Sequence, residues 1–199
     1  MDSVDYIDKN MQSALGFDTQ KDLLDYSLAQ VAVEGHYLEF GVFSGGTIRQ
    51  IARRKPNVAI HGFDSFEGLP GAWSGFNLGQ RAFARGSRLP RVPVNVTLHK
   101  GWFNETVADW TAKNPGPVAF LHIDCDLYSS TVDIFEGLKD RLQPGTVIVF
   151  DEYFNYPGWE QHECKAWREF IAARHVDYEY LGYARQQVTV RIGQIGLAT

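Results

Sequence analysis

The stretch VAFLHIDCDLYSSTVDIF, residues 118–135, decides the fold class because its character changes in the middle. Its first part is an apolar run of the length typical of a buried strand, and its last part fits a helix. Asp124 and Asp126 stand between the two parts, where the strand would end. A second stretch, GTVIVFDEYF, repeats the pattern and carries Asp151 and Glu152 after its apolar run. Buried strands rarely carry acids, so four acids at two strand ends indicate a functional site.

The rest of the chain extends this alternation of strands and helices. Apolar runs predict strands at residues 37–43, 57–66, 94–103, 118–124 and 146–151. Helices are expected at residues 2–15, 19–33, 104–113, 129–142 and 160–174, with one more after the glycines at 45 and 46. The C-terminal run YEYLGYARQQVTVRI predicts an antiparallel hairpin. The expected fold is therefore α/β, with a doubly wound, mostly parallel sheet, helices on both faces and a C-terminal antiparallel hairpin.

The chain length of 199 residues suits one domain, which we expect to span residues 1–199. Helices within residues 1–34 would precede a core at 35–199. The segment 67–93 combines Gly, Pro, Arg and Trp without a clear period, and loops of this length are usually functional. We expect this segment to be a lid or substrate loop that covers the cofactor and shapes the acceptor pocket. A plain surface loop is the alternative.

Composition and charge exclude several classes of protein. Apolar residues make up 44% of the chain, which is ordinary for a globular protein, and the net charge of −5 argues against a nucleic-acid binder. No apolar run approaches the ~20 residues of a membrane span. The two cysteines lack metal-binding spacing, and the acidic, polar N-terminus differs from a signal peptide. We therefore expect a cytoplasmic protein that binds neither nucleic acid nor membranes.

The glycine-rich run LEFGVFSGG follows the first core strand, where doubly wound folds bind nucleotides. A dinucleotide fingerprint would need glycine at position 43, but Phe43 stands there and its Cβ would obstruct a pyrophosphate. Glu39 would repel a phosphate and attract an ammonium group. Asp64, at the end of the second strand, could accept hydrogen bonds from both ribose hydroxyls. An amino-acid head, a ribose and no phosphate describe S-adenosylmethionine. In the alternative interpretation, the glycines only form a tight turn.

Five motifs together resemble one known group of enzymes. LEFGVFSGGT, GFDSFEGLP, GWFNET, DCDLYSST and PGTVIVFDEY are similar to class I S-adenosylmethionine-dependent methyltransferases, and within them to the macrocin O-methyltransferase family. The resemblance covers about residues 35–155 and implies a seven-stranded, Rossmann-like methyltransferase fold with Mg²⁺-dependent O-methylation of sugar hydroxyls in natural products. The cofactor-binding residues that it implies are Glu39, Gly41, Phe43, Ser44, Gly45, Asp64, Ser65, Gly101, Trp102 and Asp124.

The acids at the strand ends have the chemistry of a metal site. Mg²⁺ prefers oxygen ligands, and it would stabilise an acceptor hydroxyl as that hydroxyl becomes a nucleophile. Asp124 and Asp151 are 151 − 124 = 27 residues apart, which fits one strand–helix–strand unit and places the two strand ends side by side. We therefore expect Asp124, Asp151 and Glu152 to bind Mg²⁺ or another divalent cation. The family usually has two aspartates where this chain has Asp151–Glu152.

The general base has two candidates in the sequence. Asp126 follows the first metal ligand, and His162 lies in the segment after the second acid pair. A histidine that titrates near neutral pH suits proton removal. Asp126 could instead contact the ion, cap a helix or lie in a loop, and His162 could be a surface residue. The other histidines are predicted to be strand or surface residues, with no partner evident in the sequence: His36, His61, His99, His122 and His175.

Three functions remain as hypotheses. The leading one is a metal-dependent O-methyltransferase whose partner is a small hydroxylated acceptor, such as a sugar or phenolic natural product. The second is an NAD-dependent oxidoreductase, which Phe43 disfavours. The third is a non-catalytic subunit that binds S-adenosylmethionine, which the four acids disfavour. Self-association into a homo-oligomer is compatible with each hypothesis.

Overall fold

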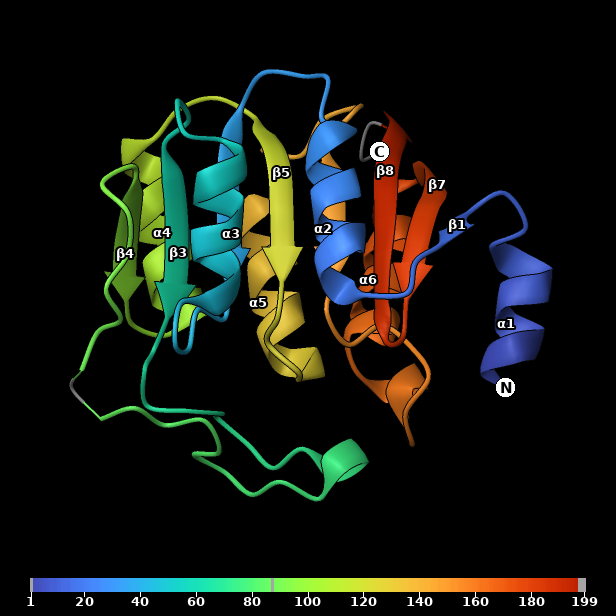
Figure 1. The fold of residues 1–199 in the computed structure, drawn as a ribbon, viewed down its shortest axis with the longest axis horizontal. Helices are drawn as coiled ribbons and strands as arrows, with labels where there is room; N and C mark the ends of the chain where they lie inside the picture. Colours follow the sequence, from blue (N-terminus) through green and yellow to red (C-terminus); the bar gives the residue numbers. More distant parts are fainter. Residues whose placement is uncertain (1, 87, 197–199) are drawn as a thin grey trace.

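The computed structural model describes residues 2–86 and 88–196, and its centre is one twisted sheet (Figure 1). The strands are β1 (Leu15–Gly16), β2 (His36–Phe40), β3 (Ile60–Asp64), β4 (Val96–Lys100), β5 (Val118–Ile123), β6 (Val147–Phe150), β7 (Val176–Ala184) and β8 (Gln187–Ile195). They lie in the order β1-β7-β8-β6-β5-β2-β3-β4. Strands β6, β5, β2, β3 and β4 pair in parallel, and β8 is antiparallel to both β6 and β7. The predicted α/β fold with its C-terminal hairpin is confirmed.

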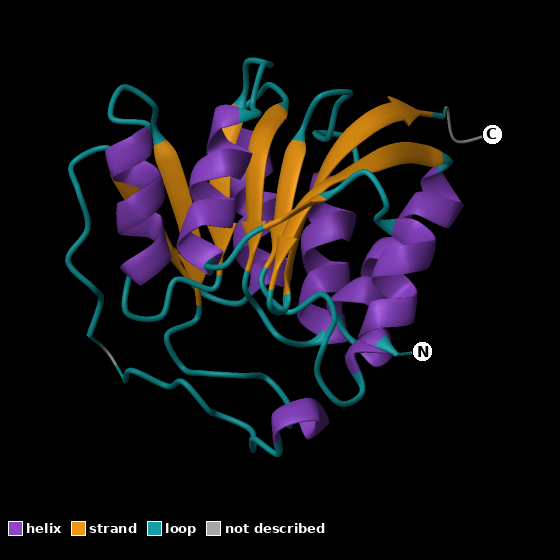
Figure 2. Cartoon of the chain, turned by 45° about the vertical axis from the view of Figure 1, so that its right-hand side comes forward, coloured by secondary structure: helices purple, strands orange, loops and turns teal. Residues whose placement is uncertain are grey.

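Helices cover both faces of the sheet (Figures 1 and 2). The α-helices are α1 (Ser3–Asn10), α2 (Gln20–Ala29), α3 (Gly46–Arg54), α4 (Phe103–Lys113), α5 (Tyr128–Leu138) and α6 (Glu163–Arg174), and the 3₁₀-helices are η1 (Ser74–Phe76) and η2 (Trp159–Gln161). Helices α2 and α3 pack on one face, and α4, α5 and α6 pack on the other. Each face has its own apolar cluster. All six residues of β5 are buried, as expected for a central strand.

The N-terminal helix is shorter than predicted. The expected helix 2–15 is wrong in its second half, because α1 ends at Asn10 and Leu15–Gly16 form β1. This short strand pairs with Gly182 and Tyr183 of β7, whose free edge offers unpaired backbone groups. The expected seven strands therefore become eight.

Two further boundaries differ from the predictions for local reasons. The strand expected at 37–43 ends at Phe40, because Gly41 turns the chain with φ of 93°. A Cβ at Gly41 would collide with the carbonyl oxygen of Asp124, so this turn requires glycine. The helix expected at 160–174 is divided into η2 and α6, because His162 between them has a non-helical backbone.

The segment 67–93 crosses the carboxyl ends of the strands and carries η1 (Figure 1). Trp73 and Leu78 exchange two backbone hydrogen bonds of 2.8 and 3.0 Å, which close a tight turn around η1. The indole of Trp73 packs edge-on against Tyr156, with 5.8 Å between ring centroids. The segment is therefore anchored to the loop that follows β6.

None of the helices in the described part of the chain combines the length and the hydropathy that a membrane span requires.

Candidate functional site

A cavity of about 530 Å³ opens at the carboxyl ends of the parallel strands. Its size is that of a small-molecule site. Eight of the predicted site residues line it: Gly41, Phe43, Asp64, Ser65, Trp102, Asp124, Asp126 and Glu152. Six others lie outside its wall: Glu39, Ser44, Gly45, Gly101, Asp151 and His162. The segment 67–93 contributes Leu69, Trp73 and Phe83 to the wall.

Asp64, at the end of β3, holds the glycine-rich turn after β2 in place. Its Oδ2 accepts the amide N–H groups of Val42 at 2.9 Å and Phe43 at 2.7 Å, and its Oδ1 accepts that of Phe66 at 2.6 Å. Phe43 and Phe66 have φ of 44° and 56°, in the left-handed region that non-glycine residues seldom adopt. The carboxylate thus stabilises two strained turns. The ribose contact predicted for Asp64 stays a prediction.

Glu39 lies behind the cavity wall. It is fully buried, and its Oε1 lies 3.2 Å from Nδ1 of His122 on the neighbouring strand β5. Its Oε2 has no hydrogen-bond partner among residues 2–86 and 88–196. Glu39 is thus not among the residues that line the cavity. Its contact with a cofactor ammonium stays a prediction.

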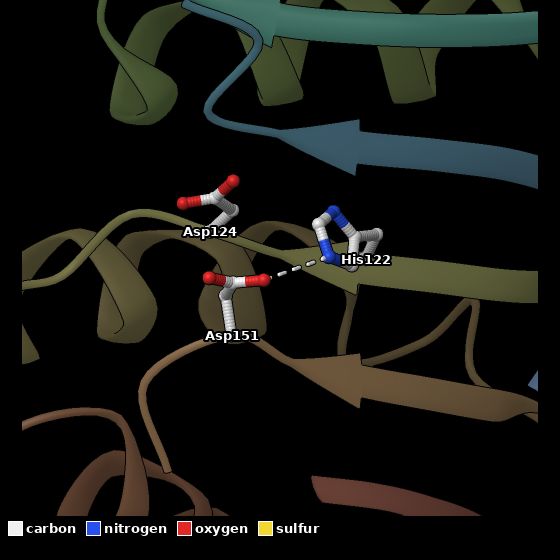
Figure 3. A group of neighbouring side chains, drawn as sticks. All are labelled: His122, Asp124 and Asp151. Atoms are coloured by element: carbon white, nitrogen blue, oxygen red, sulfur yellow. Dashed lines mark ion pairs between the residues drawn. The ribbon is translucent and has the colours of Figure 1, made fainter. Parts of the chain in front are cut away.

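His122 lies in β5, as one of the two predicted positions, and has two partners that the sequence did not reveal. Its Nε2 lies 3.5 Å from Oδ1 of Asp151 (Figure 3). Because its Nδ1 faces Glu39, the imidazole bridges two acids across three adjacent strands. Burial alone would lower the pKa of His122, but hydrogen bonds to Asp151 and Glu39 raise it well above its usual value. His122, Asp124 and Asp151 also offer ligand atoms that all lie within 4.8 Å of one another, so these three side chains form a group that could hold a metal ion.

Asp151 differs from its neighbours Asp124, Asp126 and Glu152 because hydrogen-bond donors from other strands face its carboxylate. Its Oδ1 accepts a hydrogen bond from Nε2 of Gln187 on β8 and faces His122. Burial alone would raise the pKa of Asp151, but the hydrogen bond and charge of His122 lower it below the usual value. Asp151 is thus an ionised carboxylate beside the cavity. Its role as a metal ligand stays a prediction.

Three acids face one another at the ends of β5 and β6. Oxygens of Asp124, Asp126 and Glu152 all lie within 4.8 Å of one another. Burial and the charge of Asp151 raise the pKa of all three acids, that of Asp126 to about 7. Oε2 of Glu152 is buried and has no hydrogen-bond partner in the described part of the chain. Such a set of crowded, oxygen-only donors fits a hard divalent cation.

Glu163 was missed in the sequence, although it contacts both acid-bearing loops. It is fully buried at the start of α6, and its Oε1 accepts the amide N–H groups of Cys125 and Asp126, both at 3.3 Å. Its Oε2 accepts the amide N–H of Glu152 at 3.2 Å. Burial raises the pKa of Glu163 to about 8. An acid in the first turn of a helix is a common N-terminal feature, so the sequence carried no signal of this role.

His162 is neither on the surface nor in the cavity wall. Its side chain is buried, and its ring lies 6.4 Å from that of Trp73 and 6.2 Å from that of Tyr156, between centroids. Neither ring nitrogen has a hydrogen-bond partner among the described residues. Burial lowers the pKa of His162. Between the two predicted base candidates, the geometry therefore favours Asp126, which lines the cavity.

The mostly parallel doubly wound sheet, its C-terminal antiparallel hairpin and the glycine turn after the first core strand fit the Rossmann-like methyltransferase fold. The sequence profile of a family described as a methyltransferase domain matches residues 38–153, which is more than half of the chain. The chain belongs to this family.

Individual relatives agree with this assignment. The 8-demethyl-8-(2,3-dimethoxy-α-L-rhamnosyl)-tetracenomycin-C 4′-O-methyltransferase of Streptomyces olivaceus is 29% identical over 157 residues, 66% of this chain and 59% of that protein. The chain thus spans less than two thirds of that relative's length. The crystal structure of the calicheamicin methyltransferase CalS11 has a TM-score of 0.74 at 25% identity and covers 87% of this chain and 79% of its own. MycE of the mycinamycin pathway, solved with Mg and SAH, has a TM-score of 0.59 at 16% identity over 87% of this chain and 49% of its own.

Proposed function

We propose that the protein transfers the methyl group of S-adenosylmethionine to a hydroxyl group of a small natural product, with the help of a divalent cation. The observation that carries this proposal is that one cavity has Asp64 and the glycine turn on one side and the acid cluster on the other. Membership of the methyltransferase-domain family supports it. The named activity of the Streptomyces olivaceus relative supports a hydroxyl group as the acceptor.

The cofactor half of the cavity is formed by the ends of β2, β3 and β4. S-adenosylmethionine would supply a methyl group that its sulfonium already activates. Asp64 lines this half, and a carboxylate that accepts three amide hydrogen bonds keeps a lone pair for a ribose hydroxyl. Trp102, 36% exposed after β4, offers an aromatic surface for the adenine. Phe43 stands at the position where a pyrophosphate would need glycine.

The acid half of the cavity is proposed to hold Mg²⁺ or another divalent cation. Bound there, the cation would stabilise the negative charge that develops on the acceptor oxygen. Asp124 and Glu152 are the ligands that the cavity exposes, and Asp151 lies beside Asp124. These acids are crowded enough that burial and mutual repulsion raise the pKa of Asp124 and Glu152 well above their usual values. A cation removes that repulsion and keeps the carboxylates ionised.

Asp126 is the proposed general base. It lines the cavity and lies beside Asp124 and Glu152. Without a cation, burial and the charge of Asp151 raise the pKa of Asp126 to about 7. A bound cation would lower that pKa and keep Asp126 ionised, so that it could accept the proton of the acceptor hydroxyl. Its φ of 65° is a strained value of the kind that clusters at active sites.

The acceptor is proposed to be a sugar or phenolic ring. The segment 67–93 gives this part of the wall Leu69, Trp73 and Phe83, and Phe83 packs edge-on against Phe43 at 5.8 Å between ring centroids. Aromatic surfaces of this kind pack against the apolar faces of sugars and phenols. We therefore infer that the segment both encloses the cofactor and selects the acceptor.

The proposal is tested on the unmodified protein in two steps. Calorimetry and melting curves compare S-adenosylmethionine with NAD, and the former alone is expected to bind and to raise Tm. Transfer of a labelled methyl group to a panel of rhamnosides and phenols is then measured with and without Mg²⁺. A rise of Tm with NAD alone would instead support an oxidoreductase. Cofactor binding without turnover on any acceptor would support the non-catalytic subunit.

A further inference from the structure

One buried carboxylate connects the two loops that carry the acid cluster. Glu163 contacts the loop after β5 with one oxygen and the turn after β6 with the other. The three backbone N–H groups that it accepts belong to Cys125, Asp126 and Glu152. Two of these residues are acids of the cluster itself, and Cys125 lies between Asp124 and Asp126.

We propose that Glu163 is a positioning residue that holds the Asp124–Asp126 loop and the Asp151–Glu152 turn at the separation needed for one shared divalent cation. The inference rests on the proposed function, because it assigns a supporting role to a residue next to the proposed metal site. Glu163 itself lies outside the cavity wall and points its oxygens at backbone amides.

The geometry of the first loop explains why an acceptor is required there. The N–H groups of Cys125 and Asp126 are consecutive and converge on the same oxygen of Glu163. Asp126 has a left-handed backbone, and successive N–H groups in such turns form a concave site for an anion. Without an acceptor, these buried N–H groups would be unsatisfied, and the strained turn would relax. The carboxylate of Asp126 would then move with its backbone.

Glu163 is itself held by a rigid element. It lies in the first turn of α6, where the partial positive charge of the helix N-terminus favours a carboxylate. The following residues Cys164 and Trp167 are fully buried and fix the helix against the sheet. The carboxyl group of Glu163 on this helix therefore sets the positions of both loops relative to the same fixed point, one oxygen for each loop.

The hydrogen bonds of Glu163 argue against a role in packing alone. Both of its carboxyl oxygens accept backbone N–H groups, and these groups belong to two different loops. An apolar side chain of the same size would fill the space but leave these buried N–H groups without an acceptor.

The test compares Glu163→Gln with Glu163→Asp, and uses Glu136→Gln as the matched control. A Gln side chain has one acceptor and one donor, so in either orientation one of the two loops faces an N–H group. An Asp keeps the charge but is one methylene shorter and cannot reach both loops. Glu136 is an exposed acid of α5 that pairs with Lys139, so its change to Gln repeats the chemistry on another helix.

Mn²⁺ binding, measured by the loss of the free-ion EPR signal, is the first readout. Both Glu163 variants are expected to raise the Kd for Mn²⁺ by about 10–100-fold, the range found when groups that orient metal ligands are removed. Affinity for S-adenosylmethionine should stay within about twofold of the parent, because its proposed contacts lie at β2–β4. Glu136→Gln should match the parent in both measurements. Folded Glu163 variants with parental Mn²⁺ affinity would overturn the inference.

Amide hydrogen exchange, followed by NMR without metal, is the second readout and is independent of the proposed function. In the parent protein, the amides of Cys125, Asp126 and Glu152 should be protected, and Glu163→Gln should speed exchange at one loop by about tenfold or more. Unprotected amides in the parent would overturn the inference even if no variant folds. If the parent binds no Mn²⁺ while these amides are protected, the proposed metal function fails and the contact by Glu163 stands.

Discussion

The two acid-bearing sides of the cavity differ in how their carboxylates are satisfied. On the β3 side, both oxygens of Asp64 accept backbone N–H groups, three in all. On the β5–β6 side, Asp124, Asp126 and Glu152 mainly face one another, and Oε2 of Glu152 has no partner in the described part of the chain. A carboxylate whose oxygens accept backbone N–H groups, such as that of Asp64, can hold a loop in place and still accept a hydrogen bond from an uncharged group such as a ribose hydroxyl. Acids that repel one another either take up protons or bind a cation.

Removing divalent cations should have the largest effect and tests this difference directly. Exhaustive chelation is expected to abolish methyl transfer, while calorimetry still finds S-adenosylmethionine bound, because the β3 side lacks the crowded acids. Asp124→Asn should lower metal affinity and turnover together, with partial recovery at excess Mg²⁺. Full turnover in metal-free protein would show that the acid cluster serves structure or proton transfer alone.

The next largest effect is expected from Asp126→Asn. Asn tolerates a left-handed backbone, so the loop should keep its shape while it loses the proton acceptor. The rate of methyl transfer should fall by about 10²–10⁴-fold, the usual contribution of a general base. His162→Phe is the comparison, because His162 lies outside the cavity wall among aromatic rings. If the His162 variant loses the rate and the Asp126 variant keeps it, the two assignments must be exchanged.

The sequence predicted the positions of the acids better than it predicted their partners. Apolar runs that end in acids identified β5, β6 and the positions of Asp124 and Asp151, because strand burial and strand ends are encoded locally. The partners of those acids come from other elements. His122 meets Asp151 only when β5 and β6 pair, and Glu163 meets both loops only when α6 docks. Pairings between distant elements leave no periodic signal in a single sequence.

Some predicted ends of helices and strands were wrong for a related reason. Residues 11–16 contain no strong signal against another turn of helix. In the structure, however, Leu15 and Gly16 pair with the edge of β7 and become part of the sheet. The sequence offered His162 as a general-base candidate or as a surface residue of a helix, whereas it lies buried beside the rings of Trp73 and Tyr156. Tertiary contacts decide both cases, so local propensity predicts them poorly.

A smaller effect is expected from Asp64→Ala, which acts on the other side of the cavity. Losing the proposed ribose contact should weaken S-adenosylmethionine binding by about 10–100-fold, as for one charged hydrogen bond of about 1.5–3 kcal/mol. The three amides of the glycine turn also lose their acceptor, so Tm should fall. Mn²⁺ affinity should match the parent. Calorimetry that finds unchanged cofactor affinity in the folded variant would remove Asp64 from the site.

The smallest expected effect is on the pH dependence of stability. It concerns a third region, the histidines of β2–β4, which lie away from the acid cluster. Nδ1 of His61 lies 3.0 Å from Nε2 of His99, and the ring of His61 packs against those of His36 and Trp110. Burial, together with the charges of His99 and His36, lowers the pKa of His61 to about 4. Burial lowers the pKa of His99 as well, with a contribution from Lys113. This part of the sheet therefore favours neutral imidazoles.

The sign of the resulting pH dependence follows from the two states of His61. In the unfolded chain it takes up a proton near pH ~6.5, while in the folded protein it stays neutral until about pH 4. Between these values the unfolded state binds more protons, so the free energy of unfolding falls as the pH falls through this window. Melting curves from about pH 7.5 to about pH 5 should show a loss of a few degrees in Tm that His61→Gln reduces. Because the acid cluster lies elsewhere, the difference between parent and variant should be the same with and without Mg²⁺. A difference that appears only when Mg²⁺ is absent would mean that the two regions are coupled.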